Sequence, residues 1–297
     1  MRVLVLGGSG MLGHKLYQSL APRFDTYATV RKDASEHSRY GIFDEKRLVG
    51  EALAEDCTTV ARALSAVRPT VVINCIGIVK QDAAAKDPIA NITVNSLFPH
   101  RVSQLARGVG ARLIHISTDC VFSGRRGNYS ETDLPDPPDL YGRSKLLGEI
   151  ADDGCLTIRT SMIGRELKGS HGLLEWFLSQ RDGRVRGFKR AIFSGFTTQA
   201  LAEVIGKIIV EQPKLSGIWH VAAEPISKFD LLRLVKQTYG LAIEIDRDET
   251  FACDRSLDGS RFRAITGFQP SSWPEMIQRL HDDRTPYDEI RRMNAQR

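Results

Sequence analysis

The feature that most constrains the fold is a glycine-rich loop directly after a short apolar run at the N-terminus. Residues 2–6 read Arg-Val-Leu-Val-Leu, and residues 7–13 read Gly-Gly-Ser-Gly-Met-Leu-Gly. An apolar run cut off by glycine is typical of a buried parallel strand, and the spacing over 11–20 is helical. Between a strand and a helix, such glycines make a tight turn and let backbone amides approach a pyrophosphate. The loop therefore predicts a dinucleotide site, the alternative being a turn that binds nothing.

Apolar runs and helical patterns alternate through the first half of the chain. Strands are expected at 26–30, 70–75, 112–117 and 156–160. Helices are expected at 60–67, 92–109 and 140–151. This alternation predicts an α/β fold with a doubly wound parallel sheet of the Rossmann type.

The pattern changes after Arg159. Further helices are expected at 173–179, 198–211, 228–239 and 273–280, and a further strand at 217–222. No repeat or low-complexity linker separates the two parts, so a smaller C-terminal substrate lobe is predicted to be interleaved with the sheet domain. From His281 onward the chain is strongly polar, which favours a loose helix or a frayed tail.

Charge and cysteine content limit the partners and the compartment. The 297 residues carry 41 Lys+Arg and 36 Asp+Glu, a net charge of +5, which suits anionic partners. The densest basic stretch, 181–190, is expected to be a solvated loop or helix face, or a phosphate contact. Without a basic stripe or recognition motif, nucleic acid is excluded as a partner. Five scattered cysteines and no run of ~18 apolar residues favour a soluble cytoplasmic protein with no membrane contact.

The end of the second strand indicates which dinucleotide is bound. An acidic residue there accepts from the adenosine ribose and favours NAD, whereas this chain has Arg31 and Lys32. A guanidinium can stack on adenine and pair with a 2′-phosphate. These residues predict NADPH, with NADH possible; the alternative is two surface cations.

A phenol and an ammonium are spaced for acid–base chemistry. Tyr141 and Lys145 share one helix face, one turn apart, with Asp139 as N-cap. The Lys145 cation and an oxidised nicotinamide are expected to lower the pKa of Tyr141 towards neutrality. Thr118 follows a strand at the edge where parallel sheets bind ligands and can donate to a carbonyl oxygen, with Ser117 as a competitor.

Several segments together resemble one superfamily. They are the glycine loop, Arg-Pro-Thr-Val-Val-Ile-Asn-Cys at 68–75, Ser-Thr-Asp-Cys-Val-Phe-Ser-Gly at 117–124, Glu-Thr-Asp at 131–133, Tyr-Gly-Arg-Ser-Lys at 141–145 and Arg-Thr-Ser at 159–161. The chain resembles the extended short-chain dehydrogenases/reductases and, among them, is most similar to the dTDP-4-dehydrorhamnose reductase group. The likeness is strong over about residues 1–165 and loose beyond.

The resemblance implies roles by position. Thr118, Tyr141 and Lys145 match the catalytic triad. The loop at 10–12 matches the pyrophosphate contact, and the turn at 77–79 matches the wall beside the nicotinamide ribose. The residues implied to contact the cofactor are Gly7, Ser9, Gly10, Met11, Leu12, Arg31, Lys32, Cys75, Gly77, Ile78, Val79, Ile116, Tyr141, Lys145 and Met162.

The implied activity is NADPH-dependent reduction of a nucleotide-linked 4-keto-6-deoxy sugar, in the synthesis of cell-surface polysaccharide sugars. Candidate contacts to the sugar nucleotide are Lys80, Gln81, Thr118, His171, Phe193 and Ser194. Arg184 or Arg186 is a candidate for its diphosphate. The implied domains are residues 1–162 with about 194–222 for NADP, about 163–193 with 223–281 for the sugar nucleotide, and 282–297 as the tail.

Alternatives remain open. The substrate could be a UDP-linked 2-acetamido-2,6-dideoxy-4-hexulose, or the protein could be a sugar-nucleotide epimerase. A relative of this group is the regulatory subunit of a methionine adenosyltransferase, so a non-catalytic NADP-binding subunit is a further class. Some relatives bind magnesium through an acidic residue after the glycine loop; Lys15 stands there, so no metal is expected. A homodimer is possible.

Overall fold

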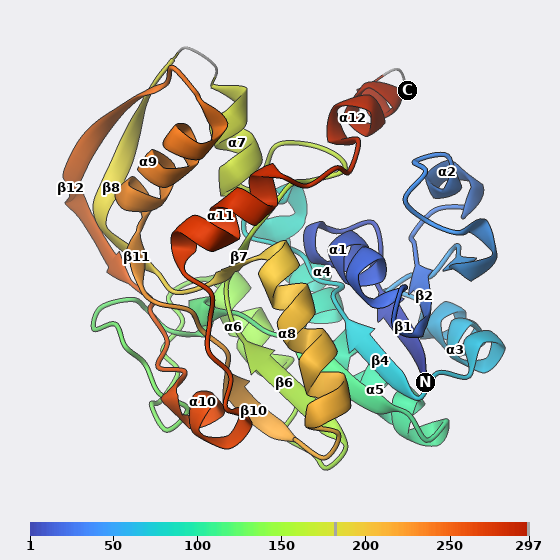
Figure 1. The fold of residues 1–297 in the computed structure, drawn as a ribbon. Coiled ribbons are helices and arrows are strands. Elements are labelled where there is room, and N and C mark those ends of the chain that lie inside the picture. Colours follow the sequence, from blue (N-terminus) through green and yellow to red (C-terminus); the bar gives the residue numbers. More distant parts are fainter. Residues whose placement is uncertain (181–182, 296–297) are drawn as a thin grey trace.

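The main sheet is parallel throughout and carries the glycine loop at its centre (Figure 1). The computed structural model describes residues 1–180 and 183–295, and in these the sheet has seven strands in the order β10-β6-β5-β4-β1-β2-β3. Its strands are β1 (Arg2–Leu6), β2 (Asp25–Thr29), β3 (Leu48–Val49), β4 (Val71–Asn74), β5 (Arg112–Ile116), β6 (Cys155–Arg159) and β10 (Gly217–His220). The predicted doubly wound α/β fold is confirmed.

Helices cover both faces of this sheet, which explains why its central strands are apolar without alternation. One apolar cluster packs beneath α1 and α8, and the other beneath α3 and α5. The helices are α1 (Met11–Leu20), α2 (Ser35–Ser38), α3 (Cys57–Val67), α4 (Pro88–Asn91), α5 (Phe98–Gly108), α6 (Leu140–Leu147), α7 (Leu173–Ser179), α8 (Thr198–Glu211), α9 (Lys228–Tyr239), α10 (Ser260–Thr266), α11 (Trp273–His281) and α12 (Tyr287–Ala295). Among the described residues, none of these helices has the length and apolar character needed to cross a bilayer.

The helix expected at 92–109 is interrupted. The structure has α4, then the π-helical turn η3 (Ile92–Leu97), then α5. Pro99 has no amide hydrogen for the carbonyl of Asn95, so a regular α-helical bond is impossible there. Gly148 packs against that carbonyl so closely that an added Cβ would overlap it. Widened turns of this kind are frequent at functional sites. The remaining short turns are η1 (Glu45–Arg47), η2 (Ala83–Lys86) and η4 (Asp119–Val121).

The C-terminal lobe is built on a second sheet. In the described part of the chain it has the order β11-β8-β12, with β8 (Arg184–Phe193), β11 (Ile226–Ser227) and β12 (Glu244–Asp254). A short pair, β7 (Met162–Ile163) and β9 (Phe196–Thr197), joins the lobe to the main sheet. The chain enters the lobe at β8 and returns to the main sheet at β10, so the two are interleaved as predicted. The domain boundaries stay a prediction.

The expectation that the basic stretch at 181–190 forms a solvated loop or helix face is wrong. From Arg184 it forms strand β8, while Arg181 lies outside the described residues. Arg184 pairs with Glu244, and Arg186 with Asp248, across the parallel β8–β12 ladder. These cross-strand charges explain why two polar segments form strands, a pairing that periodicity in one segment does not reveal.

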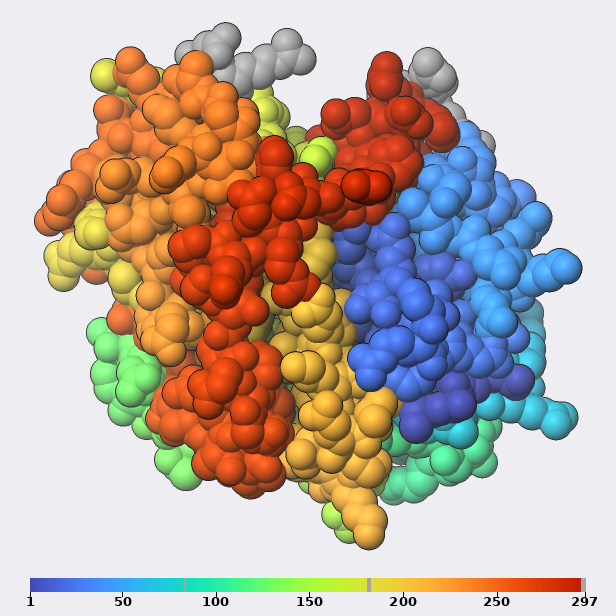
Figure 2. Space-filling model, viewed as in Figure 1, coloured from blue at the N-terminus to red at the C-terminus, as the bar shows by residue number. Residues whose placement is uncertain are grey.

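Of the two alternatives for the C-terminal segment, a loose helix or a frayed tail, the structure has the helix, α12. After α11 the chain crosses to the N-terminal part of the molecule, where α12 lies near α1 and α2 (Figures 1 and 2). Tyr287 and Ile290 are buried at this contact. Residues 296 and 297 lie outside the described part. Two apolar side chains in a polar sequence therefore anchor the helix.

Candidate active site

The glycine loop forms a tight, open-sided turn between β1 and α1. Gly7 has a positive φ of 85°, and an added Cβ at Gly13 would overlap the carbonyl of Gly7. Both positions therefore require glycine. At Gly10, the N-cap of α1, an added Cβ would meet only that same carbonyl, at 3.3 Å. Exposed amides at a helix N-terminus suit a pyrophosphate, so the loop fits the dinucleotide expected there.

The residues after β2, on the side of the cradle where adenosine is expected, include two cations. Arg31 and Lys32 are both exposed. Lys32 pairs with Glu36 at 3.3 Å, whereas Arg31 makes no ion pair within the residues that the structure describes. An exposed guanidinium without a carboxylate partner is available to a phosphate.

Lys145 lies on the other side of the glycine loop, beneath the turn at 77–79. Its Nζ donates to the carbonyl of Ile116 at 2.8 Å, and the residue is only 5% exposed. Burial lowers the pKa of Lys145 to about 8, against the opposing charge of Glu149. An added Cβ on Gly77 would lie 3.9 Å from Nζ. The end of β5, the turn at 77–79 and α6 therefore meet at the Lys145 ammonium.

Asn95 holds this arrangement together, and the sequence analysis missed it. In the π-helical turn, its side chain accepts from the amide of Ile78 at 2.9 Å and donates to the carbonyl of Ile78 at 3.0 Å. It also donates to the hydroxyl of Ser144 at 3.1 Å, next to Lys145. The sequence signal that could have revealed this role is a pair of asparagines, Asn91 and Asn95, four residues apart in a helical pattern. Buried side-chain amides need several hydrogen-bond partners, so such a pair indicates a contact with another segment.

Thr118 and Tyr141 face each other at the carboxyl end of β5. Asp139 caps α6 by accepting from the amide of Gly142 at 2.9 Å, so Tyr141 lies in the first turn, as expected. The Thr118 hydroxyl accepts from the amide of Cys120 at 3.1 Å and donates to Asp119 at 3.2 Å. It lies near enough to the Tyr141 phenol to favour the tyrosinate and lower the pKa of that phenol. The hydroxyls of Thr118 and Tyr141 therefore lie near each other at this strand end.

The pKa of Tyr141 does not move in the expected direction. Burial raises it above the ordinary value, and the nearby Thr118 hydroxyl only opposes that rise. The expectation of a lowered pKa is wrong for the protein by itself, because loss of hydration penalises the tyrosinate more than any neighbour favours it. The phenol is consequently neutral and retains its proton.

Ser117 points away from this convergence. Its hydroxyl donates to Glu149 at 2.7 Å, and Glu149 makes a bidentate pair with Arg159. These three side chains form a buried support under Lys145. Thr118 is therefore the hydroxyl that lies beside Tyr141.

The other residues proposed for the cofactor occupy the expected strand ends and turns. Cys75 and Met162 are half-buried, Ile116 and Ile78 are buried, and Val79 is exposed. Their contact with a dinucleotide stays a prediction.

The residues proposed for the sugar nucleotide lie in different surroundings. Lys80 pairs with Asp139 at 2.7 Å, and Gln81 and His171 are exposed. Phe193 is buried, as is Ser194, whose hydroxyl accepts from the amide of Leu257 at 2.9 Å. Ser194 thus fastens the lobe internally, and all these substrate contacts stay predictions.

Two cations of the lobe approach the catalytic end, and the sequence analysis did not find them. Lys228 lies 4.0 Å from the centre of the Phe193 ring. Arg255 donates to the carbonyl of Phe122 at 2.9 Å and lies 3.6 Å from the Cys120 sulfur. Burial raises the pKa of Asp119, and both cations oppose that rise. No local motif marks them, because the lobe brings them from distant segments.

A family profile described as the RmlD substrate binding domain matches residues 1–285 of the 297. The chain belongs to this family. The match covers the main sheet and the lobe and stops just before α12.

Individual relatives of this RmlD family member are more distant. A dTDP-4-dehydrorhamnose reductase of Burkholderia thailandensis is 33% identical over 168 residues, which cover 55% of this chain and 50% of that protein. Methionine adenosyltransferase 2 subunit beta of Xenopus laevis is 29% identical over 167 residues, covering 54% of this chain and 47% of that protein. The chain thus aligns with about half the length of each.

A solved structure supports the fold over nearly the whole RmlD family member. The dTDP-4-dehydrorhamnose reductase of Bacillus anthracis, in complex with NADP, superposes with a TM-score of 0.78 at 23% identity. The superposition covers 95% of this chain and 98% of that one. At this identity the likeness bears on the fold.

Proposed function

We propose that this protein is an NADPH-dependent reductase of a nucleotide-linked 4-keto-6-deoxy sugar. The observation that carries the proposal is the meeting of Thr118 and Tyr141, with Lys145 one helical turn on, beside the cradle of the glycine loop. Hydroxyl groups that converge beside a dinucleotide site suit the polarisation and protonation of a carbonyl oxygen.

Each side chain has a distinct part in the proposed reaction. When bound, NADPH supplies the hydride that reaches the sugar carbonyl carbon. Thr118 donates a hydrogen bond to the carbonyl oxygen, and Tyr141 delivers its proton to the oxygen as it becomes an alkoxide. Lys145 holds the nicotinamide ribose and stabilises the tyrosinate left behind. Burial raises the pKa of Tyr141, which favours the protonated phenol that reduction requires.

The choice of NADPH depends on the residues after β2. Arg31 is exposed and without a carboxylate partner in the described region, so it can pair with a 2′-phosphate. The NADP in the Bacillus anthracis relative supports this choice. The names of the relatives support a sugar nucleotide as substrate and dTDP as its carrier.

The direct test is a substrate panel. The purified chain is mixed with dTDP-linked and UDP-linked 4-keto-6-deoxy sugars, the 2-acetamido forms included, with NADPH or NADH, and the loss of nicotinamide absorbance is followed. We expect oxidation of NADPH with a dTDP-linked 4-keto sugar. Turnover confined to a UDP-linked 2-acetamido sugar would replace the substrate but keep the reaction. Product change without net NADPH oxidation would indicate an epimerase.

The non-catalytic alternative has its own outcome. The Xenopus laevis relative is named as a subunit of methionine adenosyltransferase, so a regulatory role is the rival class. NADPH binding without oxidation on any sugar, together with a change in the activity of an added methionine adenosyltransferase, would favour it. The intact Thr118, Tyr141 and Lys145 support the enzyme instead.

A further inference from the structure

The C-terminal segment 283–295, here called the clasp, lies across the cofactor side of the molecule. It follows α11 of the lobe and reaches the N-terminal part, as the red segment of Figure 2 shows. The match to the family profile ends at residue 285, two residues before α12 begins.

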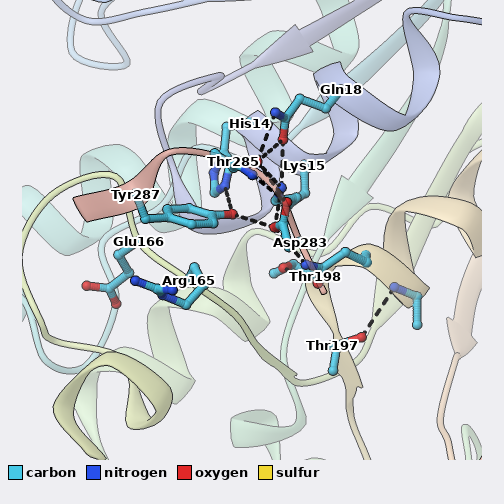
Figure 3. Close-up of polar contacts among 12 residues, drawn as sticks. His14, Lys15, Gln18, Arg165, Glu166, Thr197, Thr198, Asp283, Thr285 and Tyr287 are labelled. Carbon is cyan, nitrogen blue, oxygen red and sulfur yellow. Dashed lines mark hydrogen bonds and ion pairs between the residues drawn. The ribbon is translucent and has the colours of Figure 1, made fainter. Parts of the chain in front are cut away.

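The first contact of the clasp joins Tyr287 to His14 of α1 (Figure 3). The His14 ring is fully buried, and its Nδ1 lies 2.8 Å from the carbonyl of Gly10. Because a carbonyl only accepts, Nδ1 carries the hydrogen and Nε2 is free to accept. The Tyr287 hydroxyl lies 2.9 Å from that Nε2. Gly10 is the N-cap of α1 and makes no side-chain capping hydrogen bond. Tyr287 of the clasp therefore contacts the glycine loop indirectly, through the His14 imidazole.

The second contact is a buried ion pair beneath the same helix. Lys15 and Asp283 approach to 2.5 Å, and their side chains are 6% and 11% exposed. Lys15 also donates to Thr285 at 2.8 Å. The Tyr287 hydroxyl lies 3.0 Å from Asp283 and 2.9 Å from His14 Nε2, so these two acceptors share its single hydrogen. A buried pair with further hydrogen bonds has a single favourable geometry. The clasp is therefore fixed to the first turns of α1.

The third set of contacts joins the two flanks of the cradle. On the adenosine side, the Tyr40 hydroxyl donates to Asn294 at 2.7 Å. On the lobe side, Asn294 donates to the carbonyl of Leu167 at 3.1 Å, and Arg291 donates to the carbonyl of Gly169 at 2.6 Å. The loop that contains Leu167 and Gly169 precedes Gly172, where an added Cβ would lie 2.7 Å from the Met11 side chain. One short helix thus contacts both flanks.

We propose that the clasp sets the affinity for the dinucleotide, with Tyr287, His14 and Asp283 as positioning residues for the glycine loop. The inference rests on the proposed function, because it takes the dinucleotide as the ligand of this loop. Amides bind a pyrophosphate well only when they already point towards it, and ordering a loop on binding costs affinity. Removing the clasp contacts leaves the catalytic hydroxyls in place and loosens the cradle.

The test compares two tyrosine-to-phenylalanine variants of the full-length protein. Tyr287→Phe keeps the ring, which lies between His14 and Arg165, and removes the hydroxyl. Tyr239→Phe is the matched control, because its hydroxyl is buried without a hydrogen-bond partner in the described part of the chain. We expect the Kd for NADPH, from its fluorescence, to rise about tenfold in Tyr287→Phe and to stay unchanged in Tyr239→Phe. At saturating NADPH, kcat and the sugar KM should stay within about twofold of wild type.

Amide hydrogen exchange separates positioning from general destabilisation. In Tyr287→Phe, exchange should increase in the first turn of α1, where the His14 amide bonds to Gly10, and not in β4 or β5. Unchanged NADPH affinity with unchanged exchange in α1 would overturn the proposal. So would a uniform rise in exchange, with kcat lowered as much as affinity, since that is the result of a purely structural residue.

A failure of the proposed function is distinguishable from a failure of the clasp. If wild type does not bind NADPH, the proposed function fails, and the exchange of α1 amides still decides whether Tyr287 orders the loop. A chain that ends at Asp282 provides a second variant. If it folds, it should match or exceed the loss of affinity in Tyr287→Phe; wild-type affinity would contradict the clasp.

Discussion

Two buried lysines on either side of the glycine loop differ in what holds them. Lys145 and Lys15 are each 5% exposed, and burial lowers the pKa of both. Lys15 has a carboxylate, Asp283, at 2.5 Å, whereas the nearest partner of Lys145 is the neutral carbonyl of Ile116 at 2.8 Å. A paired buried cation holds structure, and a buried cation facing a neutral acceptor remains available for a ligand or a proton.

The same contrast applies to the groups around them. Beside Lys145, Glu149 favours the ammonium by its charge without forming an ion pair in the described part of the chain. Beside Lys15, the clasp supplies the carboxylate of Asp283 and the hydroxyl of Thr285 as partners of the ammonium. We therefore expect substitutions at the first site to change turnover and substitutions at the second to change stability and cofactor affinity.

The largest expected effect is on turnover at Tyr141. Tyr141→Phe removes the proton donor and keeps the ring, so kcat should fall by about 10²–10⁴-fold, the usual contribution of general acid catalysis. NADPH affinity should stay near wild type, as measured by fluorescence titration. Wild-type turnover in this variant would remove Tyr141 from the mechanism.

Exchanging each lysine for methionine tests the comparison itself. Lys15→Met leaves Asp283 buried without its cation and should lower the free energy of unfolding by about 3 kcal/mol. Lys145→Met should leave stability equal or higher and abolish most turnover, because no carboxylate pairs with it among the described residues. Urea unfolding and initial rates measure the two effects. Lys15→Arg, which keeps the charge, is the control, and equal stability losses at both sites would contradict the contrast.

The pH dependence of stability sharpens the same contrast. The pKa of Lys145 is lowered to about 8 by burial, so above that pH the folded protein loses a proton that the unfolded chain keeps up to about 10.5. The unfolded state then binds more protons, and stability rises with pH between the two values. Wild type should gain about 3 kcal/mol over Lys145→Met across this window. Parallel profiles for the two proteins would show that Lys145 is not desolvated.

The smallest effects on stability and on the sugar KM are expected from substitutions in strand β8 of the lobe. Arg184 and Arg186 face Glu244 and Asp248 and have highly exposed side chains. The double variant Arg184→Gln, Arg186→Gln should change stability by under about 1 kcal/mol and the sugar KM by less than about twofold. A large rise in KM would restore the idea that these arginines bind the diphosphate.

Local sequence carried the prediction of the main sheet and of the candidate catalytic end. Residues 2–20 contain a buried strand, a glycine turn and the start of a helix one after another. Their local pattern was therefore enough to predict this part of the fold. Tyr141 and Lys145 are one helical turn apart, and α7, α8 and α9 have the predicted bounds. Strand β12 escaped prediction, because its polar residues form a strand only when β8 lies alongside.

What only the tertiary structure decided depends on contacts between distant segments. Asn95 reaches Ile78 and Ser144, Lys228 reaches the end of β5, and Asp283 reaches Lys15 across 268 residues of sequence. The rise in the pKa of Tyr141 also depends on the tertiary structure, because burial is a property of the packed protein. The sequence by itself determined the fold class and pointed to the candidate reacting groups, because these follow from local periodicity and spacing. The packing determined their protonation and the clasp, because desolvation and long-range pairing exist only once the chain has folded.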